Sequence, residues 1–359
     1  MASARNPARG TGDEVLDAAL RKVVGLIGSE TNRDLVREIL STVVLLAQED
    51  QDRLDLKITS AALAEMREAF GVFRPYRHSQ KVTMFGSART RSDDPLYVQA
   101  RELAGLVAAE GWMVVTGAGP GIMAAGMEGA GRQQSIGVNI RLPFEQGANP
   151  FIADDPKLVE MKYFFTRKLM LVKESDAYVA LPGGFGTLDE TFELLTLLQT
   201  GKAMPAPLIL LDVPGGTYWA RWLQFVNEEV LAHGLISAVD LGMFRITDSV
   251  ATAAEEIFGF YRSYDSLRYV GGRLVLRLRV APSDCDVQEL DETFGDILVP
   301  GRGGFELVGP SSAEVAEHDH VDLHRLAFPF DQLSLGRLRQ LIDHLNGLDP
   351  PEGSDQPTA

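Results

Sequence analysis

The sequence predicts an α/β fold: a doubly wound parallel sheet with an N-terminal helical extension and a small C-terminal α+β module. Short apolar runs alternate with helical periodicity between residues 81 and 212, and each run is followed by glycine or proline, which predicts the sheet. A strictly alternating run near residue 273 predicts the module. Ligands of parallel sheets bind beyond the carboxyl ends of the strands. The glycine-rich turns at 86, 117 and 183 are therefore expected to meet in one crevice.

Residues 13–78 are expected to form a helical extension and a linker. Apolar side chains recur there at three- and four-residue steps: Val36, Ile39, Leu40, Val43, Val44 and Ala47. Ser60 is expected to cap a third helix that runs through Arg67. The two ends of the chain, residues 1–12 and 349–359, are polar and rich in Gly, Pro and Ser, so both are expected to be disordered tails.

Residues 79–264 are expected to form the main domain. Its predicted strands lie at 82–85, 112–116, 135–140, 177–181 and 208–212. An amphipathic helix from Tyr97 to Glu110 follows the first strand, and another helix begins at Ile122. Apolar strands separated by helices indicate a parallel sheet that is covered on both faces.

Residues 265–348 are expected to form the α+β module. Arg273–Val280 alternates strictly between apolar and other residues, as an antiparallel strand with one solvated face does. A helix is predicted at 287–294 and a capped helix at 334–346, with strands at 305–308 and 325–330. The predicted order is β-α-β-β-α.

Composition excludes several classes of function. The net charge of −16 argues against a nucleic-acid or membrane-surface binder, because both need basic patches. The charge does not exclude a small phosphorylated ligand, which a few amides and one arginine can hold. The single cysteine, Cys285, rules out an intramolecular disulfide and a Cys-rich zinc site. No signal peptide or membrane span is recognisable, which makes a cytoplasmic protein the default expectation.

The turn Gly117-Ala-Gly-Pro-Gly121 differs from a dinucleotide-binding fingerprint. The sixth position of G-x-G-x-x-G is Ile122, and Asn139 stands where an acidic residue would end the next strand. A nicotinamide dehydrogenase is therefore not expected. A simple chain reversal and a contact to mononucleotide phosphate or ribose both remain open for this turn.

The stretch Leu181–Glu190 reads as a strand-to-helix turn, with helical spacing evident over 191–199. Such a turn offers unpaired backbone N–H groups to an anion. Taken alone, Asp189 and Glu190 would merely complement the helix dipole. Likewise Arg167 and Lys168, in an apolar helix upstream, would be a snorkelling pair if they stood alone.

Together these residues form a specific combination. Pro182-Gly-Gly-Phe-Gly-Thr-Leu-Asp-Glu190, preceded by the Arg-Lys pair, resembles the family named after the plant "lonely guy" cytokinin-activating enzymes, often mislabelled lysine decarboxylases. Every fixed position of the family signature P-G-G-x-G-T-x-x-E is matched. Phe85–Ser87, the glycine turn 117–121 and Leu142–Gln146 resemble the bacterial branch. The resemblance covers roughly residues 80–260.

The resemblance implies a Rossmann-like nucleotide-binding catalytic domain in a homodimer or higher oligomer. Its activity would be hydrolysis of the N-glycosidic bond of a purine nucleoside 5′-monophosphate, AMP or a modified adenine nucleotide, without cofactor or metal. Glu190 would stabilise the cationic transition state and take a proton from water, while Arg167 would hold that carboxylate or bind the ligand. The expected substrate-binding residues are Lys168, Gly183, Gly184, Phe185, Gly186, Thr187, Thr196, Gly86, Ser87, Gly119, Gly121 and Glu145.

Within that set the roles differ. The amides from Gly183 to Thr187, with the Thr187 hydroxyl, would hold the 5′-phosphate. Thr196 would be a further ligand contact, and Glu145 would bind ribose. The helix around Arg167 is apolar on more than one face, which indicates burial against a second subunit; its apolar residues are Phe164, Phe165, Leu169, Met170 and Leu171.

A non-catalytic nucleotide-binding, carrier or regulatory protein on the same fold is the alternative. The Arg167–Glu190 pair favours the enzyme, because a binder needs the glycine turn but not that carboxylate. A lysine decarboxylase is not expected, since that reaction normally uses pyridoxal phosphate on a Schiff-base lysine and Lys168 belongs to the Arg-Lys pair. His318, His320 and His324 are close enough in sequence for a metal cluster, although a solvated polar loop is the more ordinary reading. No motif names the preferred base.

Overall fold

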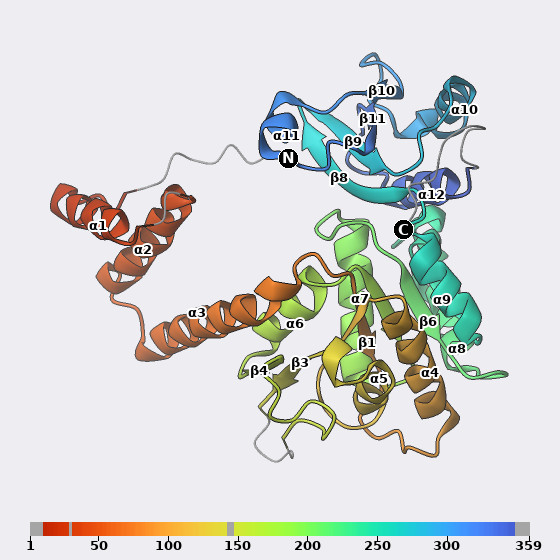
Figure 1. The fold of residues 1–359 in the computed structure, drawn as a ribbon, viewed down its shortest axis with the longest axis horizontal. Coiled ribbons are helices and arrows are strands. Elements are labelled where there is room, and N and C mark those ends of the chain that lie inside the picture. The colour runs from red at the N-terminus through yellow and green to blue at the C-terminus, as the bar shows by residue number, and fades with distance from the viewer. Residues whose placement is uncertain (1–9, 29–30, 142–146, 349–359) are drawn as a thin grey trace. The chain divides into compact units, whose positions relative to one another are not determined.

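The computed structural model describes residues 10–28, 31–141 and 147–348. The chain divides into two compact units between Arg67 and Glu68. The first unit is helical, and its helices are α1 (Glu14–Leu26), α2 (Arg33–Gln48) and α3 (Arg53–Phe73), the last of which continues into the second unit (Figure 1). The predicted cap at Ser60 is wrong, because α3 starts seven residues earlier. Asp52 ends the preceding turn instead, and its carboxylate accepts from the Leu54 N–H at 3.0 Å.

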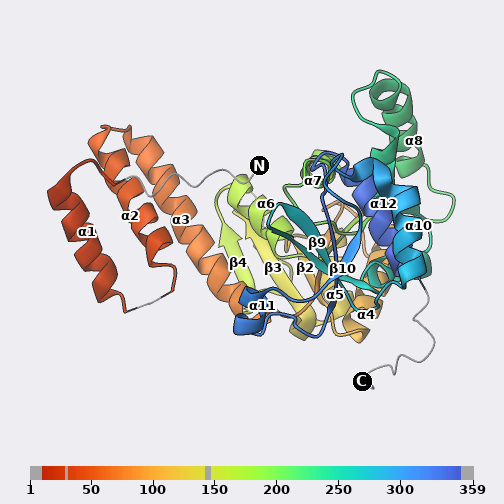
Figure 2. The ribbon, with the colours of Figure 1, turned by 90° about the horizontal axis from the view of Figure 1, so that it is seen from above.

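A seven-stranded parallel sheet forms the centre of the second unit, in the order β4-β3-β2-β1-β5-β6-β7 (Figures 1 and 2). Its strands are β1 (Lys81–Phe85), β2 (Met113–Thr116), β3 (Ser135–Ile140), β4 (Leu158–Met161), β5 (Ala177–Ala180), β6 (Leu208–Leu211) and β7 (Arg245–Thr247). The register places Val82 of β1 opposite Val114 and Ala177 of its two neighbours. The predicted α/β class is confirmed. The two edge strands, β4 and β7, were not expected, because neither has the fully buried pattern of the others.

Helices cover this sheet and set the direction of its winding. They are η1 (Arg74–Tyr76), α4 (Pro95–Ala109), α5 (Ile122–Ala130), η2 (Arg132–Gln134), α6 (Phe164–Lys173), α7 (Phe185–Gln199), α8 (Tyr218–Phe225), η3 (Val226–Leu231), η4 (Ala238–Met243) and α9 (Val250–Gly259). Helices α4, α5 and α9 pack on one another and bury an apolar cluster against the sheet that includes Val82, Leu103 and Val179. Helix α6 packs over β3 and β4.

The winding reverses between β1 and β5. From β1 the chain adds β2, β3 and β4 on one side, and from β5 it adds β6 and β7 on the other. Connections that leave two adjacent strands in opposite directions open a crevice at their carboxyl ends, which is where ligands bind in sheets of this kind. Gly86 follows β1 and Gly183 follows β5. The topology therefore puts two of the predicted turns at this point.

The C-terminal part of the second unit is a separate antiparallel sheet with its own core, in the order β10-β11-β9-β8. Its elements are β8 (Tyr264–Val270), β9 (Arg273–Leu278), α10 (Asp284–Phe294), η5 (Gly295–Ile297), β10 (Glu306–Val308), α11 (Ser312–Glu317), β11 (His324–Phe328) and α12 (Leu335–Asn346). The predicted order lacks β8 and α11. A signal for β8 was present, since Gly271 and Gly272 both have positive φ in a tight hairpin, the turn that paired glycines favour.

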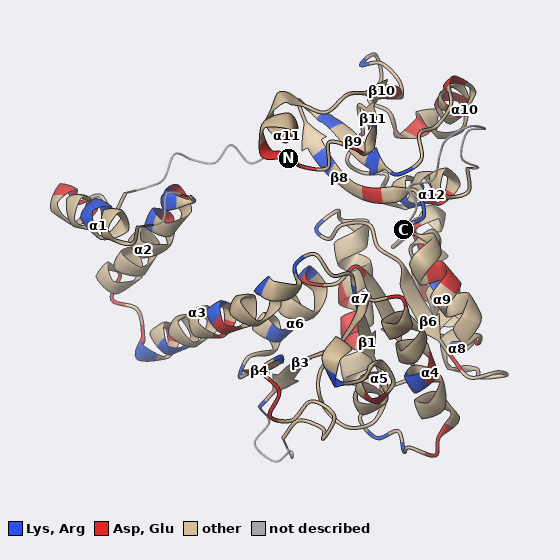
Figure 3. Ribbon diagram, viewed as in Figure 1, with Lys and Arg blue, Asp and Glu red and all other residues tan. Residues whose placement is uncertain are grey.

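One face of this smaller sheet, which was predicted to be solvated, buries Arg277 and Arg325, whereas Arg279 on the same face is exposed. Arg277 is 6% exposed and Arg325 2% exposed, because α11 brings Glu314 over them. Arg277 Nη2 donates to Glu314 Oε1 at 2.6 Å and to Asp319 Oδ2 at 2.5 Å. Burial alone would raise the pKa of Glu314, but hydrogen bonds from Arg277 and Ser311 outweigh it and hold that pKa far below its usual range. Figure 3 shows the basic positions of these strands beside the acidic positions of α11.

Candidate active site

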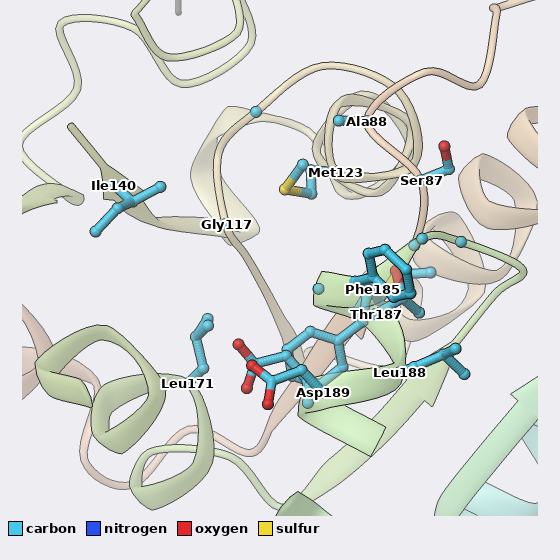
Figure 4. Close-up of a pocket in the computed structure, with 18 of the residues that line it drawn as sticks. Ser87, Ala88, Gly117, Met123, Ile140, Leu171, Phe185, Thr187, Leu188 and Asp189 are labelled. Atoms are coloured by element: carbon cyan, nitrogen blue, oxygen red, sulfur yellow. The ribbon is translucent and has the colours of Figure 1, made fainter. Parts of the chain in front are cut away.

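A pocket of about 840 Å³ opens at the carboxyl ends of β1, β2, β3 and β5. Ten of the predicted site residues line it: Gly86, Ser87, Gly119, Arg167, Gly183, Gly184, Phe185, Gly186, Thr187 and Glu190. Figure 4 shows Ser87, Phe185 and Thr187 toward one end of the pocket and Ile140 and Leu171 toward the other. The predicted glycine turns thus meet in one crevice.

Three predicted site residues that the structure describes do not line the pocket. Lys168 lies behind the pocket carboxylate, and Gly121 packs beneath the turn that follows β1. Thr196 is exposed on α7, and its hydroxyl donates to the Phe192 carbonyl of the same helix at 2.8 Å. Glu145 lies outside the described residues.

The turn after β5 is shorter than predicted, because α7 begins at Phe185, inside the glycine motif. Gly184 is the N-terminal cap, and the Thr187 N–H already bonds the Gly184 carbonyl at 3.1 Å. The amides of Phe185 and Gly186 belong to the first helical turn, whose N–H groups lack partners within the helix. Gly183 is required by space, since a Cβ there would lie 2.1 Å from Thr187 Oγ1. The motif therefore forms a helix N-terminus with free amides, an arrangement that binds anions in many proteins.

Tyr218, the first residue of α8, supports this turn and was not predicted. Its hydroxyl donates to the Gly183 carbonyl at 2.8 Å, and its side chain lines the pocket. Asp212, at the end of β6, fixes the start of α8 by accepting from the N–H groups of Val213 and Tyr218. Because C=O and N–H point in opposite directions across a trans peptide, the bond to Gly183 turns the Gly184 N–H away from Tyr218. No local sequence signal links Tyr218 to the glycine motif, which lies 35 residues earlier.

Glu190 is the titratable group at the centre of the pocket. It lies on the second turn of α7 and is 6% exposed. Burial raises its pKa to about 7, against the opposing charges of Lys168 and Arg167. Its Oε2 has no hydrogen-bond partner among the described residues. A carboxylate whose pKa is close to 7 is suited to exchange a proton with a ligand or a water molecule near neutral pH.

The Lys168 ammonium is shared among three carboxylates of α7. Lys168 Nζ lies 2.7 Å from Asp189, 2.5 Å from Glu193 and 3.8 Å from Glu190 Oε2. Burial disfavours its charge, but the hydrogen bonds that Lys168 donates to Asp189 and Glu193 outweigh burial and raise the pKa of Lys168. Figure 3 shows basic positions on α6 and acidic positions on α7. Lys168 is therefore a fixed cation behind the pocket, held closest to the two outer carboxylates.

Arg167 lines the pocket and bonds the strand ends. Its Nε donates to the Val138 carbonyl at 2.9 Å and its Nη2 to the Gly117 carbonyl at 3.4 Å. A Cβ at Gly117 would lie 1.8 Å from Nη2, so the guanidinium needs glycine at that position. The prediction that Arg167 and Glu190 share one site stays consistent with this placement, since both line the same pocket.

The turn after β2 closes the third side of the pocket. Gly121 has φ of +66°, and a Cβ there would lie 2.2 Å from the Ser87 carbonyl oxygen, so the turns after β1 and β2 pack backbone to backbone. Asn149 supports the same turn from behind, because its Nδ2 donates to the carbonyls of Ala118 and Gly119 at 3.0 Å each. This turn therefore reverses the chain and also forms one wall of the pocket.

The histidine motif and membrane segments can be judged for the described part of the chain. His318 and His320 lie in the loop after α11, and His324 starts β11. Within residues 10–28, 31–141 and 147–348, no group of three His, Cys, Asp or Glu side chains is placed to hold a metal ion. Over the same residues, the helices are too short or too polar to cross a membrane.

Known proteins resemble parts of this chain. Residues 121–257 match the family described as "Possible lysine decarboxylase". A probable cytokinin riboside 5′-monophosphate phosphoribohydrolase of Oryza sativa subsp. japonica is 40% identical over 89 residues, which are 25% of this chain and 39% of that protein. A cytokinin riboside 5′-monophosphate phosphoribohydrolase of Arabidopsis thaliana is 44% identical over 71 residues, which are 20% of this chain and 32% of that protein. The matches thus span well under half of these relatives.

Among solved structures, the molybdenum cofactor carrier protein of Chlamydomonas reinhardtii is 21% identical and is covered over 94% of its chain and 49% of this one, with a TM-score of 0.35. A likeness at that level supports no functional conclusion. The sequence matches confirm the resemblance seen in the glycine and Arg-Lys motifs. Residues 121–257 thus resemble the family described as possible lysine decarboxylases, and the chain is a distant, partial homologue of proteins named cytokinin riboside 5′-monophosphate phosphoribohydrolases.

Proposed function

We propose that this pocket hydrolyses the N-glycosidic bond of a purine nucleoside 5′-monophosphate, giving free base and ribose 5-phosphate. The observation that carries the proposal is Glu190, a buried pocket carboxylate whose pKa is raised to about 7 and whose Oε2 lacks a hydrogen-bond partner among the described residues. It lies on the same helix whose N-terminus forms the anion site. A proton acceptor and a phosphate site are thus held by one rigid element.

The reaction needs little more than these groups. Water adds to the anomeric carbon as the bond from that carbon to the base nitrogen breaks, and the electron pair stays on the nitrogen. The base takes up one proton, and the water gives one proton to the Glu190 carboxylate. While the bond breaks, positive charge develops on the sugar, and the negative Glu190 stabilises it.

The phosphate would lie at the start of α7. The first-turn amides of Phe185 and Gly186 and the Thr187 hydroxyl supply donors, and the Gly184 N–H is turned from Tyr218 by the peptide geometry described above. We assign Arg167 to the ligand, because its side chain lines the pocket. Roles for Thr196 and Glu145 remain proposals from the resemblance.

Decarboxylation of lysine fits these residues poorly. A Schiff-base lysine must lose its proton to act as a nucleophile. Lys168 has a raised pKa and is bonded by Asp189 and Glu193. Lys81, whose pKa burial lowers, begins β1 and so lies at the amino end of the strand, whereas the pocket lies beyond its carboxyl end.

We further propose that the protein works as a homodimer or higher oligomer. Helix α6 buries Met170 and Leu171 inward, yet Phe164, Phe165 and Leu169 are each more than 40% exposed on it. Three large apolar side chains on the helix that carries Arg167 form a patch of the kind that marks a subunit interface.

Incubation with AMP and with adenosine tests the activity. We expect adenine and ribose 5-phosphate from AMP in the presence of a metal chelator, and a much slower reaction with adenosine, because adenosine cannot use the helix N-terminus. Chromatography of the free base measures both. Tight binding of AMP without any release of adenine would refute the enzyme and favour a non-catalytic nucleotide-binding protein. Equal rates for the two compounds would refute the phosphate site.

A further inference from the structure

The end of the pocket away from the phosphate turn contains a side chain that nothing above uses. Asn139 is the fifth residue of β3, lines the pocket and is 9% exposed. Its side-chain amide has no hydrogen-bond partner among the described residues. An amide at a pocket wall that makes no bond within the protein is free to bond a ligand or a water molecule.

Its surroundings differ from those of the phosphate turn. Ile140 and Leu171 line the pocket on this side, and both are apolar. In Figure 4, Ile140 and Leu171 lie across the pocket from Ser87 and Thr187. Apolar walls with one convergent amide are suited to a flat heterocycle that buries its faces and presents a polar edge.

The spacing of the strands agrees with this placement. β3 is three strands from β5 in the sheet order, so their carboxyl ends are about 14 Å apart at 4.8 Å per strand. In a nucleoside monophosphate, the phosphate and the base lie on opposite sides of the ribose. With the phosphate at the start of α7 and the anomeric carbon near Glu190, the base extends toward β3.

We propose that Asn139 reads the edge of the base and makes the site select purines with a hydrogen-bonding group at C6. The inference rests on the proposed nucleotide site. An asparagine amide offers a donor and an acceptor side by side, which matches N6–H and N7 of adenine. If the amide is rotated by 180°, its donor matches O6 of a 6-oxopurine and its acceptor matches N1–H. A purine that carries only hydrogen at C6 leaves either the donor or the acceptor of the amide without a partner.

Asn149 provides a matched control. It is also a buried asparagine near the pocket, 6% exposed, but its amide is bonded to Ala118 and Gly119 behind the glycine turn. Asn→Leu at either position removes one amide at similar volume. Loss of the Asn149 amide should weaken the binding of every nucleotide alike, because it disturbs the pocket wall. Loss of the Asn139 amide should change the preference between bases.

The test compares AMP with purine riboside 5′-monophosphate, which lacks the 6-amino group. Binding is measured by calorimetry in the Glu190→Gln background, so that the result does not depend on turnover. We expect the protein with Asn139 to prefer AMP by about tenfold or more, since one bidentate pair discriminates by about 1–3 kcal/mol. Asn139→Leu should reduce the preference to within about twofold, while Asn149→Leu should keep it. IMP should follow AMP in each case.

Two results would overturn the inference: equal affinities in the presence of Asn139, or an unchanged preference in Asn139→Leu. If Asn149→Leu fails to fold, the comparison of Asn139→Leu with its parent still decides. Failure of the proposed hydrolysis would look different, because the base preference in binding would persist while no variant released free base. Absence of binding by either monophosphate would refute both proposals.

Discussion

Glu190→Gln should make the protein more stable above neutral pH while it stops the reaction. The substitution keeps the size of the side chain and removes its charge. In the folded state the pKa of Glu190 is about 7, whereas the pKa of an ordinary glutamate is 4.5. This difference corresponds to about 3 kcal/mol at 1.36 kcal/mol per pH unit, and it is a cost of folding with the charge buried.

The sign follows from where the proton sits. Below pH 4.5 both states are protonated and the cost is absent. Between pH 4.5 and 7 the unfolded chain has released the proton that the folded chain keeps, so unfolding releases a proton and rising pH favours it. Above pH 7 the cost is complete. The variant should therefore gain up to about 3 kcal/mol over the wild type at pH 8 and nothing from this source at pH 4.

Urea denaturation of both proteins at several pH values between 4.5 and 8 measures the effect. The change of the difference with pH is the informative quantity, because the new amide also adds a contribution that does not depend on pH. A difference that stays constant from pH 4.5 to 8 would refute the raised pKa of Glu190 and with it the proton acceptor of the proposed reaction.

Glu190→Gln is expected to lose turnover but to keep nucleotide binding. AMP hydrolysis should fall by at least about a hundredfold, the usual scale for the loss of a general base, while AMP binding persists through the start of α7. Glu193→Gln is the matched control, since it makes the same change one helical turn away and outside the pocket lining. It should retain turnover at pH 8. Near-normal turnover in Glu190→Gln would exclude the assigned role.

Two further predictions concern the phosphate turn and the assembly. Tyr218→Phe removes the hydrogen bond to the Gly183 carbonyl and should weaken AMP binding about fivefold, the worth of about 1 kcal/mol, with little effect on adenosine; calorimetry with both ligands checks this, and equal losses would indicate a general disturbance. Light scattering of the active protein should give at least twice the monomer mass of 39.2 kDa, and activity in a particle of monomer mass would refute the shared-interface proposal.

The sequence predicted those parts of the fold that local patterns determine. The central strands were found because each is a buried run, whereas β4 and β7 lie at the sheet edges and are only partly buried. Arg277 was expected to face solvent because alternation reports which residues share a face, not what later covers that face. Here α11, a helix of six residues, covers the face that carries Arg277.

The same limit applies to the site. Residues inside the glycine motif were predictable, since their chemistry depends on a strand-to-helix turn that the sequence spells out. Tyr218 was not, because its bond to Gly183 depends on how Asp212 shapes a loop in three dimensions. Asn139 had been noted for the missing acidic residue of a dinucleotide fold, and its place in the pocket became visible with the sheet order.

The acidic residues around Lys168 connect the sequence pattern to the chemistry. A lysine beside a single buried glutamate would approach it closely and lower its pKa. Here Asp189 and Glu193 hold the ammonium at 2.7 and 2.5 Å, while Glu190 Oε2 is 3.8 Å away. The negative charges of both neighbours also raise the pKa of Glu190. Glu193→Gln should therefore shift the acid limb of the pH–rate profile to lower pH, and a limb that moved upward would show that the outer carboxylates do not set the pKa of Glu190.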